Sequence, residues 1–422
     1  MTEVENPSRI AIQPWMAEPA TLAVLGALSS GGAEARFVGG SVRDALLGQP
    51  IGDIDIATAA PPERVIELLD KHGIKVVPTG LTHGTVTAIA GTPPRHFEIT
   101  TLRRDVETYG RRARVAFDAD WAADAGRRDF TINAIFLAPD GTIHDPVGGL
   151  ADLRARRIRF VGDPATRIAE DVLRLLRYYR FEARFGIGGG DPQARAACRA
   201  AANLLPTLSA ERVAQELVKL LEAPDPTPAL RMIQEDGVLE VILPEARRID
   251  RLLQMIAIEP NPDPLRRLAA LIEVDGAGAD IVAARLRFSN PWRDRLRGLA
   301  PPRLLDPQGN RAAQRQALYR LGAERYRDHA LLIAAEGAIA CNRLTELLAF
   351  AQEWTPPVFP LSGRDVTALG IPPGERVGKL LDTLHDWWVA GDFTADRYSC
   401  LIRLKEAAEA GILCPPASGI VQ

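Results

Sequence analysis

The stretch ARFVGGSVRDALLGQPIGDIDIAT, residues 35–58, decides the fold of the N-terminal part of this chain. The residues 35–38 predict a short strand, and two glycines then lead into a helix over 42–47 that stops at Gly48. Residues 51–58 alternate between polar and apolar side chains, which predicts a second strand. Further strands and helices mix through about residue 150, so this region is predicted to be an α/β head.

Two carboxylates, Asp53 and Asp55, stand two residues apart in the second predicted strand. Residues two apart in a strand point to the same face of the sheet. Adjacent carboxylates repel each other unless a cation neutralises them, and hard oxygen ligands suit Mg²⁺. Glu98, between apolar neighbours in a later predicted strand, is a candidate third acid for a phosphoryl-transfer site. The alternative is that all three are solvated acids of an edge strand.

The glycine turn before these acids is a candidate phosphate site. Gly39, Gly40 and Ser41 link a strand to a helix, and glycines allow close approach of the backbone to a phosphate. The helix N-terminus behind them offers free N–H groups, and Arg43 adds positive charge. Taken alone, the same residues are equally consistent with a tight structural turn.

A third segment, GRRDFTINA at residues 126–134, places arginines beside an acid and an amide, Asn133. Arg128 and Asp129 are suited to a triphosphate and to a ribose hydroxyl, because an ionised Asp accepts hydrogen bonds. Such an Asp would select ribonucleotides. The alternative is an Arg–Asp pair on the surface, which contributes little to stability.

The segment EDVLRLLRYYRF, residues 170–181, has apolar residues at helical spacing and predicts one helix. Asp171 and Arg174 are three residues apart and would share a face of it. Cytosine and adenine both present an amino donor beside a ring-nitrogen acceptor, whereas guanine and uracil present the opposite order. One acceptor (Asp) and one donor (Arg) therefore select C and A without a template. The alternative to base recognition is that Asp171 and Arg174 form a salt bridge on a solvated face of the helix.

After residue 152 the apolar spacing is helical almost to the end, with proline clusters between helical blocks, so the fold class is predicted to be α+β. At 422 residues the chain should hold more than one unit. Its net charge is −3, yet residues 154–184 carry nine arginines and four acids, which favours local contact with phosphates. The four cysteines form no CxxC pair, and we expect no membrane span or export signal and a cytoplasmic location.

Taken together and in order, these segments resemble class II tRNA nucleotidyltransferases (CCA-adding enzymes) and bacterial poly(A) polymerases, of the polymerase-β-like superfamily. The segments that carry the resemblance are residues 39–44, 53–55, 127–134, 148–153, 170–181 and 209–212. The resemblance implies a nucleotidyltransferase head followed by an all-helical neck, body and tail. The implied parts are the catalytic head at 1–150, the base-recognising neck at 151–222, the body at 223–300 and the RNA-binding tail at 301–422.

The resemblance also implies roles for single residues. Asp53 and Asp55 would hold Mg²⁺, and Glu98 would be the third catalytic acid. The implied nucleotide-binding residues are Gly39, Gly40 and Arg43 at the triphosphate, Arg128 and Asp129 at the nucleotide with Asp129 at the ribose, Asp171 and Arg174 at the base, and Arg177 and Arg180 at phosphates. Ser41 and Asn133 are implied to bind the nucleotide as well.

The implied activity is addition of the 3′-terminal CCA to tRNA from CTP and ATP. Residues 78–87 are poor in charge and resemble the CCA type rather than the basic stretch of poly(A) polymerases. The segment Arg103–Asp124 resembles the flexible loop that enzymes adding only CC lack. Three alternatives stay open, namely an A-adding enzyme with the same loop, a poly(A) polymerase, and a non-catalytic RNA-binding relative. His144-Asp145 and His385-Asp386 are isolated pairs, so no HD phosphohydrolase activity is expected.

Overall fold

The computed structural model contains a mixed sheet near the N-terminus followed by helices, which confirms the predicted α+β class. It describes residues 9–81, 84–109, 112–117 and 120–409. Its contacts divide the chain into two compact units; the first runs to Ile249 and includes 262–264 and 285–288, and the second comprises the remainder. The predicted division into four parts is finer than this and stays a prediction. No helix among the described residues is long and apolar enough to cross a membrane.

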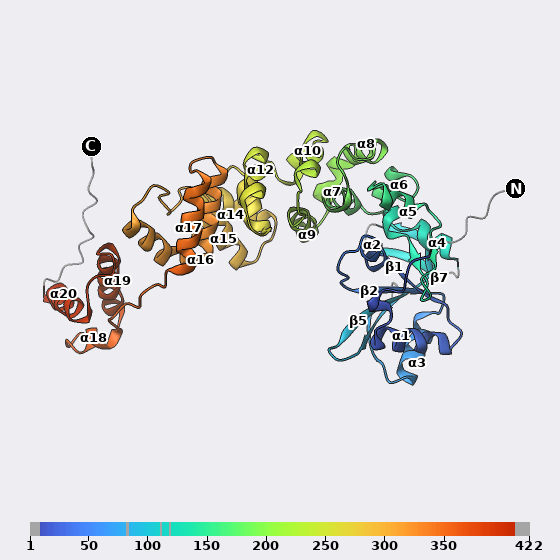
Figure 1. The fold of residues 1–422 in the computed structure, drawn as a ribbon, viewed down its shortest axis with the longest axis horizontal. Helices are drawn as coiled ribbons and strands as arrows, with labels where there is room; N and C mark the ends of the chain where they lie inside the picture. Colours follow the sequence, from blue (N-terminus) through green and yellow to red (C-terminus); the bar gives the residue numbers. More distant parts are fainter. Residues whose placement is uncertain (1–8, 82–83, 110–111, 118–119, 410–422) are drawn as a thin grey trace. The chain divides into compact units, whose positions relative to one another are not determined.

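The sheet of the first unit has seven strands in the order β3-β4-β5-β2-β1-β8-β9. Figure 1 labels β1, β2 and β5 of this sheet. Its strands are β1 Ala35–Val38, β2 Ile54–Thr58, β3 Lys75–Gly80, β4 Thr85–Ala90, β5 Arg95–Thr101, β8 Phe136–Leu137 and β9 Ile143–His144. Among these strands β2 and β5 pair in parallel, and the other neighbouring pairs are antiparallel. Ile54 and Ile56 of β2 are fully buried, as the alternating pattern predicts. Helices α1 and α3 pack against each other and against β4.

Helices account for most of the rest of the first unit. They are η1 Pro14–Met16, α1 Pro19–Ser30, α2 Gly40–Leu46, α3 Pro62–Lys71, α4 Trp121–Gly126, η3 Thr131–Asn133, α5 Gly149–Arg154, α6 Pro164–Glu170, α7 Leu173–Phe185, α8 Pro192–Ala201, η4 Ala202–Thr207, α9 Ala210–Leu221, α10 Thr227–Glu235 and α11 Val238–Ile242. The segment 103–124 is not irregular over its described residues, because β6 Arg103–Tyr109 and β7 Arg112–Phe117 pair as a separate two-stranded sheet.

Most of the second unit is helical as well. Its helices are α12 Ile249–Ile258, α13 Pro264–Leu271, α14 Gly276–Arg285, α15 Asn290–Leu299, α16 Arg311–Ala335, α17 Cys341–Glu353, α18 Gly363–Thr367, α19 Glu375–Ala390 and α20 Arg397–Glu409. Helix α16 has a kink at Gly322, where the backbone is not helical (φ 75°, ψ 162°), so it consists of two helical segments in succession.

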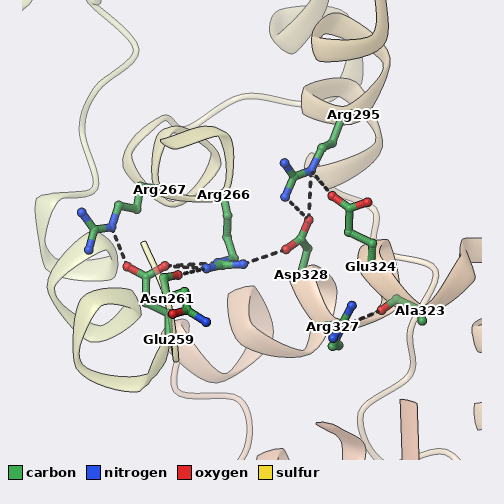
Figure 2. A network of polar contacts seen from close by, with 9 residues as sticks. All are labelled: Glu259, Asn261, Arg266, Arg267, Arg295, Ala323, Glu324, Arg327 and Asp328. Atoms are coloured by element: carbon green, nitrogen blue, oxygen red, sulfur yellow. Dashed lines mark hydrogen bonds and ion pairs between the residues drawn. The ribbon is translucent and has the colours of Figure 1, made fainter. Parts of the chain in front are cut away.

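A chain of buried ion pairs ties the helices of the second unit together (Figure 2). Asp328 of α16 accepts hydrogen bonds from Arg266 of α13 at 3.0 Å and from Arg295 of α15 at 2.7 Å. Arg266 also donates to Glu259 at 2.7 Å, and Arg267 donates to the other oxygen of Glu259. The carboxylates of Asp328 and Glu259 are each 2% exposed. Because a buried charge without its partner is strongly destabilising, these pairs fix how the helices pack.

Candidate active site

The carboxylates meet in the middle of the head sheet. Asp55 of β2 lies between Val38 of β1 and Glu98 of β5, which are its partners in register on either side. Burial, and then the like charge of Glu98, raise the pKa of Asp55 to about 6, and Asp53 adds to the rise. Three carboxylates therefore influence one small region of the head.

The prediction that one strand carries both aspartates is wrong. Strand β2 begins one residue after Asp53, at Ile54, which pairs with Phe97 of β5. Asp53 thus lies in the exposed turn that enters the strand, while Asp55 is partly buried within it. The two side chains differ in solvent access, which a shared strand face would not predict.

The glycine turn lies directly against Asp55. Gly39 has a φ of 75° and a ψ of −135°, a backbone conformation that residues with a Cβ rarely adopt. A Cβ at Gly39 would also lie only 3.0 Å from Oδ2 of Asp55. Gly40 begins helix α2, and the Ser41 hydroxyl donates to the carbonyl of Val38 at 3.1 Å. The turn therefore leaves no room for a side chain between its backbone at Gly39 and the Asp55 carboxylate.

Arg43 is held inside the head rather than extended into solvent. Its guanidinium donates to Asp44 at 2.9 Å and, through Nη1, to Oδ1 of Asn133 at 2.7 Å. It also lies over the ring of Phe185 of α7, 4.2 Å from the ring centre. Burial lowers the pKa of Arg43, and the charge of Asp44 opposes this change. These contacts give the arginine a fixed position one turn into α2.

The two arginines of residues 126–134 are organised by Asp124, which sequence reasoning missed. Asp124 is 1% exposed and accepts from Arg127 at 2.8 Å and from Arg128 at 2.8 Å. Burial alone would raise the pKa of Asp124, but the charges of the two arginines outweigh it and the pKa is lowered. The acid three and four residues before a pair of arginines was the available signal. The predicted alternative, a surface pair of Arg128 with Asp129, is not what the structure shows.

Asp129 is surrounded by donors. Its Oδ1 accepts from the N–H of Phe130 at 2.9 Å and from Nδ2 of Asn133 at 3.2 Å. Its Oδ2 accepts from Nε of Arg177, on α7, at 2.7 Å, and Nη2 of the same arginine lies 2.5 Å away. Burial would raise the pKa of Asp129, but the charge of Arg177 and these hydrogen bonds lower it, so the carboxylate is ionised.

Comparison with known proteins identifies this arrangement. Residues 35–159 match the model of the poly A polymerase head domain, and residues 191–249 match that of a probable RNA and SrmB-binding site of polymerase A. The mitochondrial CCA tRNA nucleotidyltransferase 1 of Homo sapiens is 34% identical over 388 residues, which cover 88% of this chain and 87% of the human protein. The chain belongs to the CCA tRNA nucleotidyltransferase family.

Other members of the CCA tRNA nucleotidyltransferase family agree. The CCA-adding enzyme of Geobacillus stearothermophilus is 40% identical over 238 residues, which cover 56% of this chain and 57% of that one. The crystal structure of the Bacillus stearothermophilus CCA-adding enzyme in complex with CTP is similar with a TM-score of 0.75 and 30% identity, covering 93% of this chain and 99% of that chain. The predicted family, and the prediction that the chain is an enzyme that transfers nucleotides to tRNA, are confirmed.

The residues predicted to read the base in this nucleotidyltransferase lie differently from expectation. The single helix predicted over 170–181 is wrong, because α6 ends at Glu170 and α7 begins at Leu173. Asp171 stands in the break with extended backbone (φ −152°, ψ 107°), so it does not share a helix face with Arg174. Neither Gly nor Pro marks this break, and the local signal for it is Asp171, a residue type that favours helix N-termini.

The expected contact between the two residues is replaced by other partners. Oδ2 of Asp171 accepts from Arg212 of α9 at 2.7 Å, and Oδ1 accepts from the N–H of Leu173 at 3.1 Å. Arg174 donates through Nη1 to Glu170 and to the carbonyl of Arg167. Arg212 belonged to a recognised segment, residues 209–212, but had no predicted role.

The remaining predicted arginines point into the same part of the first unit. Arg177 reaches Asp129, and Arg180 lies 2.6 Å from Glu216 of α9 and over the ring of Phe181, 4.4 Å from its centre. Burial lowers the pKa of Arg180, and Glu216 opposes this. Acids from distant elements thus neutralise part of the charge that residues 154–184 carry by themselves.

The acids of the head fit a magnesium ion. Asp53 and Asp55 would supply hard oxygen ligands, and the like charges that raise the pKa of Asp55 are those that a cation would offset. Within the described part of the chain no group of three or more His, Cys, Asp or Glu side chains is placed to hold a metal ion. Mg²⁺ in proteins usually takes several of its ligands from waters and substrate phosphate oxygens.

Proposed function

We propose that this enzyme adds the 3′-terminal CCA to tRNA, using CTP and ATP, Mg²⁺ and the carboxylates Asp53 and Asp55. The proposal rests on the position of Asp55, which pairs in register with Glu98 and lies against the Gly39 turn. It rests also on the membership of the chain in this family. The human relative is named a CCA tRNA nucleotidyltransferase, the Geobacillus relative is named a CCA-adding enzyme, and the similar solved structure is a complex with CTP. A cytoplasmic location remains a prediction.

In the proposed reaction the RNA 3′-hydroxyl attacks the α-phosphorus of the incoming nucleotide in line, and pyrophosphate leaves. Bound Mg²⁺ would lower the pKa of that hydroxyl and stabilise the leaving oxygens. The N–H groups of Gly40 and Ser41 at the start of α2 would bind the triphosphate, with Arg43 and Arg128 opposing its charge. These groups act mainly by positioning, since their places in the fold are already fixed.

Base selection in this proposal falls to Asp171 and Arg174. Each oxygen of Asp171 accepts a hydrogen bond, from Leu173 or from Arg212, and a carboxylate oxygen has capacity for a second, such as one from a base amino group. Among the described contacts Arg174 donates through Nη1. Its Nε and Nη2 groups would then donate hydrogen bonds to the base. Rejection of G and U would follow because a buried donor or acceptor without a partner costs about 1–3 kcal/mol.

Ribose recognition in this proposal falls to Asp129, and it requires a rearrangement. A carboxylate offers about four acceptor positions, and Phe130, Asn133 and the two groups of Arg177 occupy them. The Arg177 side chain is 33% exposed, so it is the donor best able to move when a 2′-hydroxyl binds. A released Arg177 would be free to meet a phosphate.

The decisive test supplies a tRNA that lacks CCA with CTP, with ATP, and with both, and resolves product length to one nucleotide. Two additions from CTP and three from both substrates would establish CCA synthesis. A long ladder from ATP would show a poly(A) polymerase instead, and a single A added to a CC-ended tRNA would show an A-adding enzyme. No extension under any condition would leave a non-catalytic RNA-binding relative.

The same assay tests the carboxylates. The Asp53→Ala variant should be folded and inactive, and Asp70→Ala, at an exposed position of α3 in the same head, is the matched control and should be active. Near-normal turnover by folded Asp53→Ala would remove the assignment.

A further inference from the structure

A groove of the first unit lies at the opposite end of α2 from the Gly39 turn. It has a volume of about 310 Å³ and lies where the end of α2 meets α5, both of which Figure 1 labels. Apolar side chains line it, among them Leu46, Leu47 and Leu150. Because α2 has seven residues and is therefore about 10 Å long, the groove is separate from the site of the carboxylates.

Two of the arginines that line this groove have no acid to neutralise them. Arg154 and Arg156 belong to the run RARRIR, in which the other two arginines have a structural use. Arg157 and Arg159 donate to the two oxygens of the fully buried Asp152, at 2.7 Å and 2.8 Å. Arg154 and Arg156 are exposed and form no ion pair with any of the described residues. The groove therefore carries positive charge that is available to a ligand.

Arg156 occupies a backbone position at which glycine is the usual residue. It follows Ala155, the C-cap of α5, and its φ of 50° lies in the left-handed region. Its N–H donates to the carbonyl of Leu153 at 3.1 Å, and that of Arg157 donates to the carbonyl of Asp152 at 2.9 Å. These two bonds define a Schellman motif, which favours Gly at this position. Arginine is the costlier choice for the fold, and what it adds is a guanidinium in the groove.

We propose that this groove binds the phosphate backbone of the RNA substrate, with Arg154 and Arg156 at phosphates and the apolar residues against a sugar. This inference rests on the proposed function, in which the incoming nucleotide binds at the other end of α2. The RNA is then the polyanion left to neutralise the two arginines. Arg9 adds a third charge to the groove, although Oδ2 of Asp140 lies 3.6 Å from it. The groove lies outside residues 191–249, which match the model of an RNA-binding site.

The first experiment measures the affinity for a tRNA that lacks CCA, by fluorescence anisotropy over a range of salt concentrations. In the double variant Arg154→Ala/Arg156→Gly the Kd should rise about tenfold, and the slope of log Kd against log salt should fall by about one to two. Lys71→Ala/Lys75→Ala is the matched control, because it removes two positive charges from exposed positions near β3, the opposite edge of the sheet from β9. The control should keep the wild-type Kd, and an equal loss in both double variants would overturn the proposal.

Arg156→Gly alone separates binding from folding. Because glycine adopts the left-handed conformation readily, the Tm of this variant should equal or exceed that of wild type while its affinity for the tRNA falls. Arg156→Lys keeps the charge and should recover most of the affinity. A variant Arg156→Gly that is folded and binds the tRNA as tightly as wild type would overturn the proposal. If Arg156→Gly is unfolded, Arg154→Ala, at the exposed end of α5, carries the same binding test.

Steady-state kinetics identify what the groove binds. In the double variant Arg154→Ala/Arg156→Gly the KM for tRNA should rise about tenfold and the KM for CTP should not. A rise in the KM for CTP alone would overturn the proposal, because it would mean that the groove holds the incoming nucleotide. If wild type binds the tRNA and extends none of it, the proposed function fails. If wild type extends the tRNA and the groove variants bind it equally well, this inference alone fails.

Discussion

Replacing Asp55 by Asn should stabilise the metal-free enzyme while it abolishes nucleotide transfer. Asp55 is partly buried, and Glu98 and Asp53 add negative charge, so its pKa rises from 3.8 to about 6. A difference of about two pKa units corresponds to about 3 kcal/mol of unfolding free energy. Asn keeps the shape of Asp but carries no charge, and therefore it should recover most of that amount near neutral pH.

The sign of the pH dependence follows from the direction of this shift. The folded state binds a proton at Asp55 more tightly than the unfolded state does, so ionisation of Asp55 opposes folding. This penalty is fully present above about pH 6, shrinks as the pH falls through the window between 6 and 3.8, and is absent below it. The advantage of Asp55→Asn should therefore be largest near pH 8 and small near pH 4.

The assay is thermal unfolding of wild type and Asp55→Asn in EDTA across this pH range. For a unit of about 250 residues, 3 kcal/mol corresponds to a rise in Tm of roughly 6–12 °C. Asp70→Asn, at an exposed position in α3, is the control and should change little. Added Mg²⁺ should raise the Tm of wild type more than that of the variant. The reasoning would be refuted if the two proteins had an equal Tm near pH 8, or if the difference between their Tm values did not change with pH.

Three further predictions concern other parts of the chain. Asp171→Ala should reduce the preference for CTP over UTP by about tenfold, measured as kcat/KM, with little change in tRNA affinity; a preserved preference would contradict the base-reading role. Asp328→Ala should lower the unfolding free energy by about 3–5 kcal/mol in urea denaturation, because it removes the buried carboxylate that Arg266 and Arg295 share, and a loss below 1 kcal/mol (about the value of a surface pair) would argue against it. Gly149→Ala should cost roughly 3 kcal/mol or more, since its Cβ would lie 2.0 Å from the carbonyl oxygen of Thr131, whereas Gly26→Ala, which meets nothing within 4 Å, should be neutral or stabilising in the same assay.

Local chemistry made part of the site predictable from the sequence. Gly39 needs a backbone conformation that few other residues adopt, so two glycines between a strand and a helix indicate a tight turn at this point, although not by themselves a phosphate site. The period of two in β2 and β5 likewise predicted buried apolar residues and placed Glu98 on a strand, which the structure shows to be the neighbour of β2. In both cases the prediction depends only on residues that are close together in the sequence.

Partners from distant elements were not predictable. Arg212 lies 41 residues from Asp171, and Arg177 lies 48 residues from Asp129. At the break between α6 and α7 the carboxylate of Asp171 is engaged by Arg212, although the apolar pattern predicted a continuous helix. The local signal that the prediction passed over is Asp171 itself, because Asp favours helix N-termini and here accepts from the N–H of Leu173.

In the proposed mechanism the arrangement around Asp129 connects base selection to the chemistry. Helix α7 contains Arg174, one of the two residues proposed to read the base, and one turn later presents Arg177 to Asp129. Asp129 in turn bonds to Asn133, and Asn133 bonds to Arg43 beside the carboxylates. A shift of α7 on binding of a wrong base would therefore move a hydrogen-bond partner of the ribose site, and through Asn133 it would disturb the phosphate site. Discrimination against G and U should consequently be visible in kcat as well as in KM, because a displaced phosphate partner slows the reaction after the nucleotide has bound.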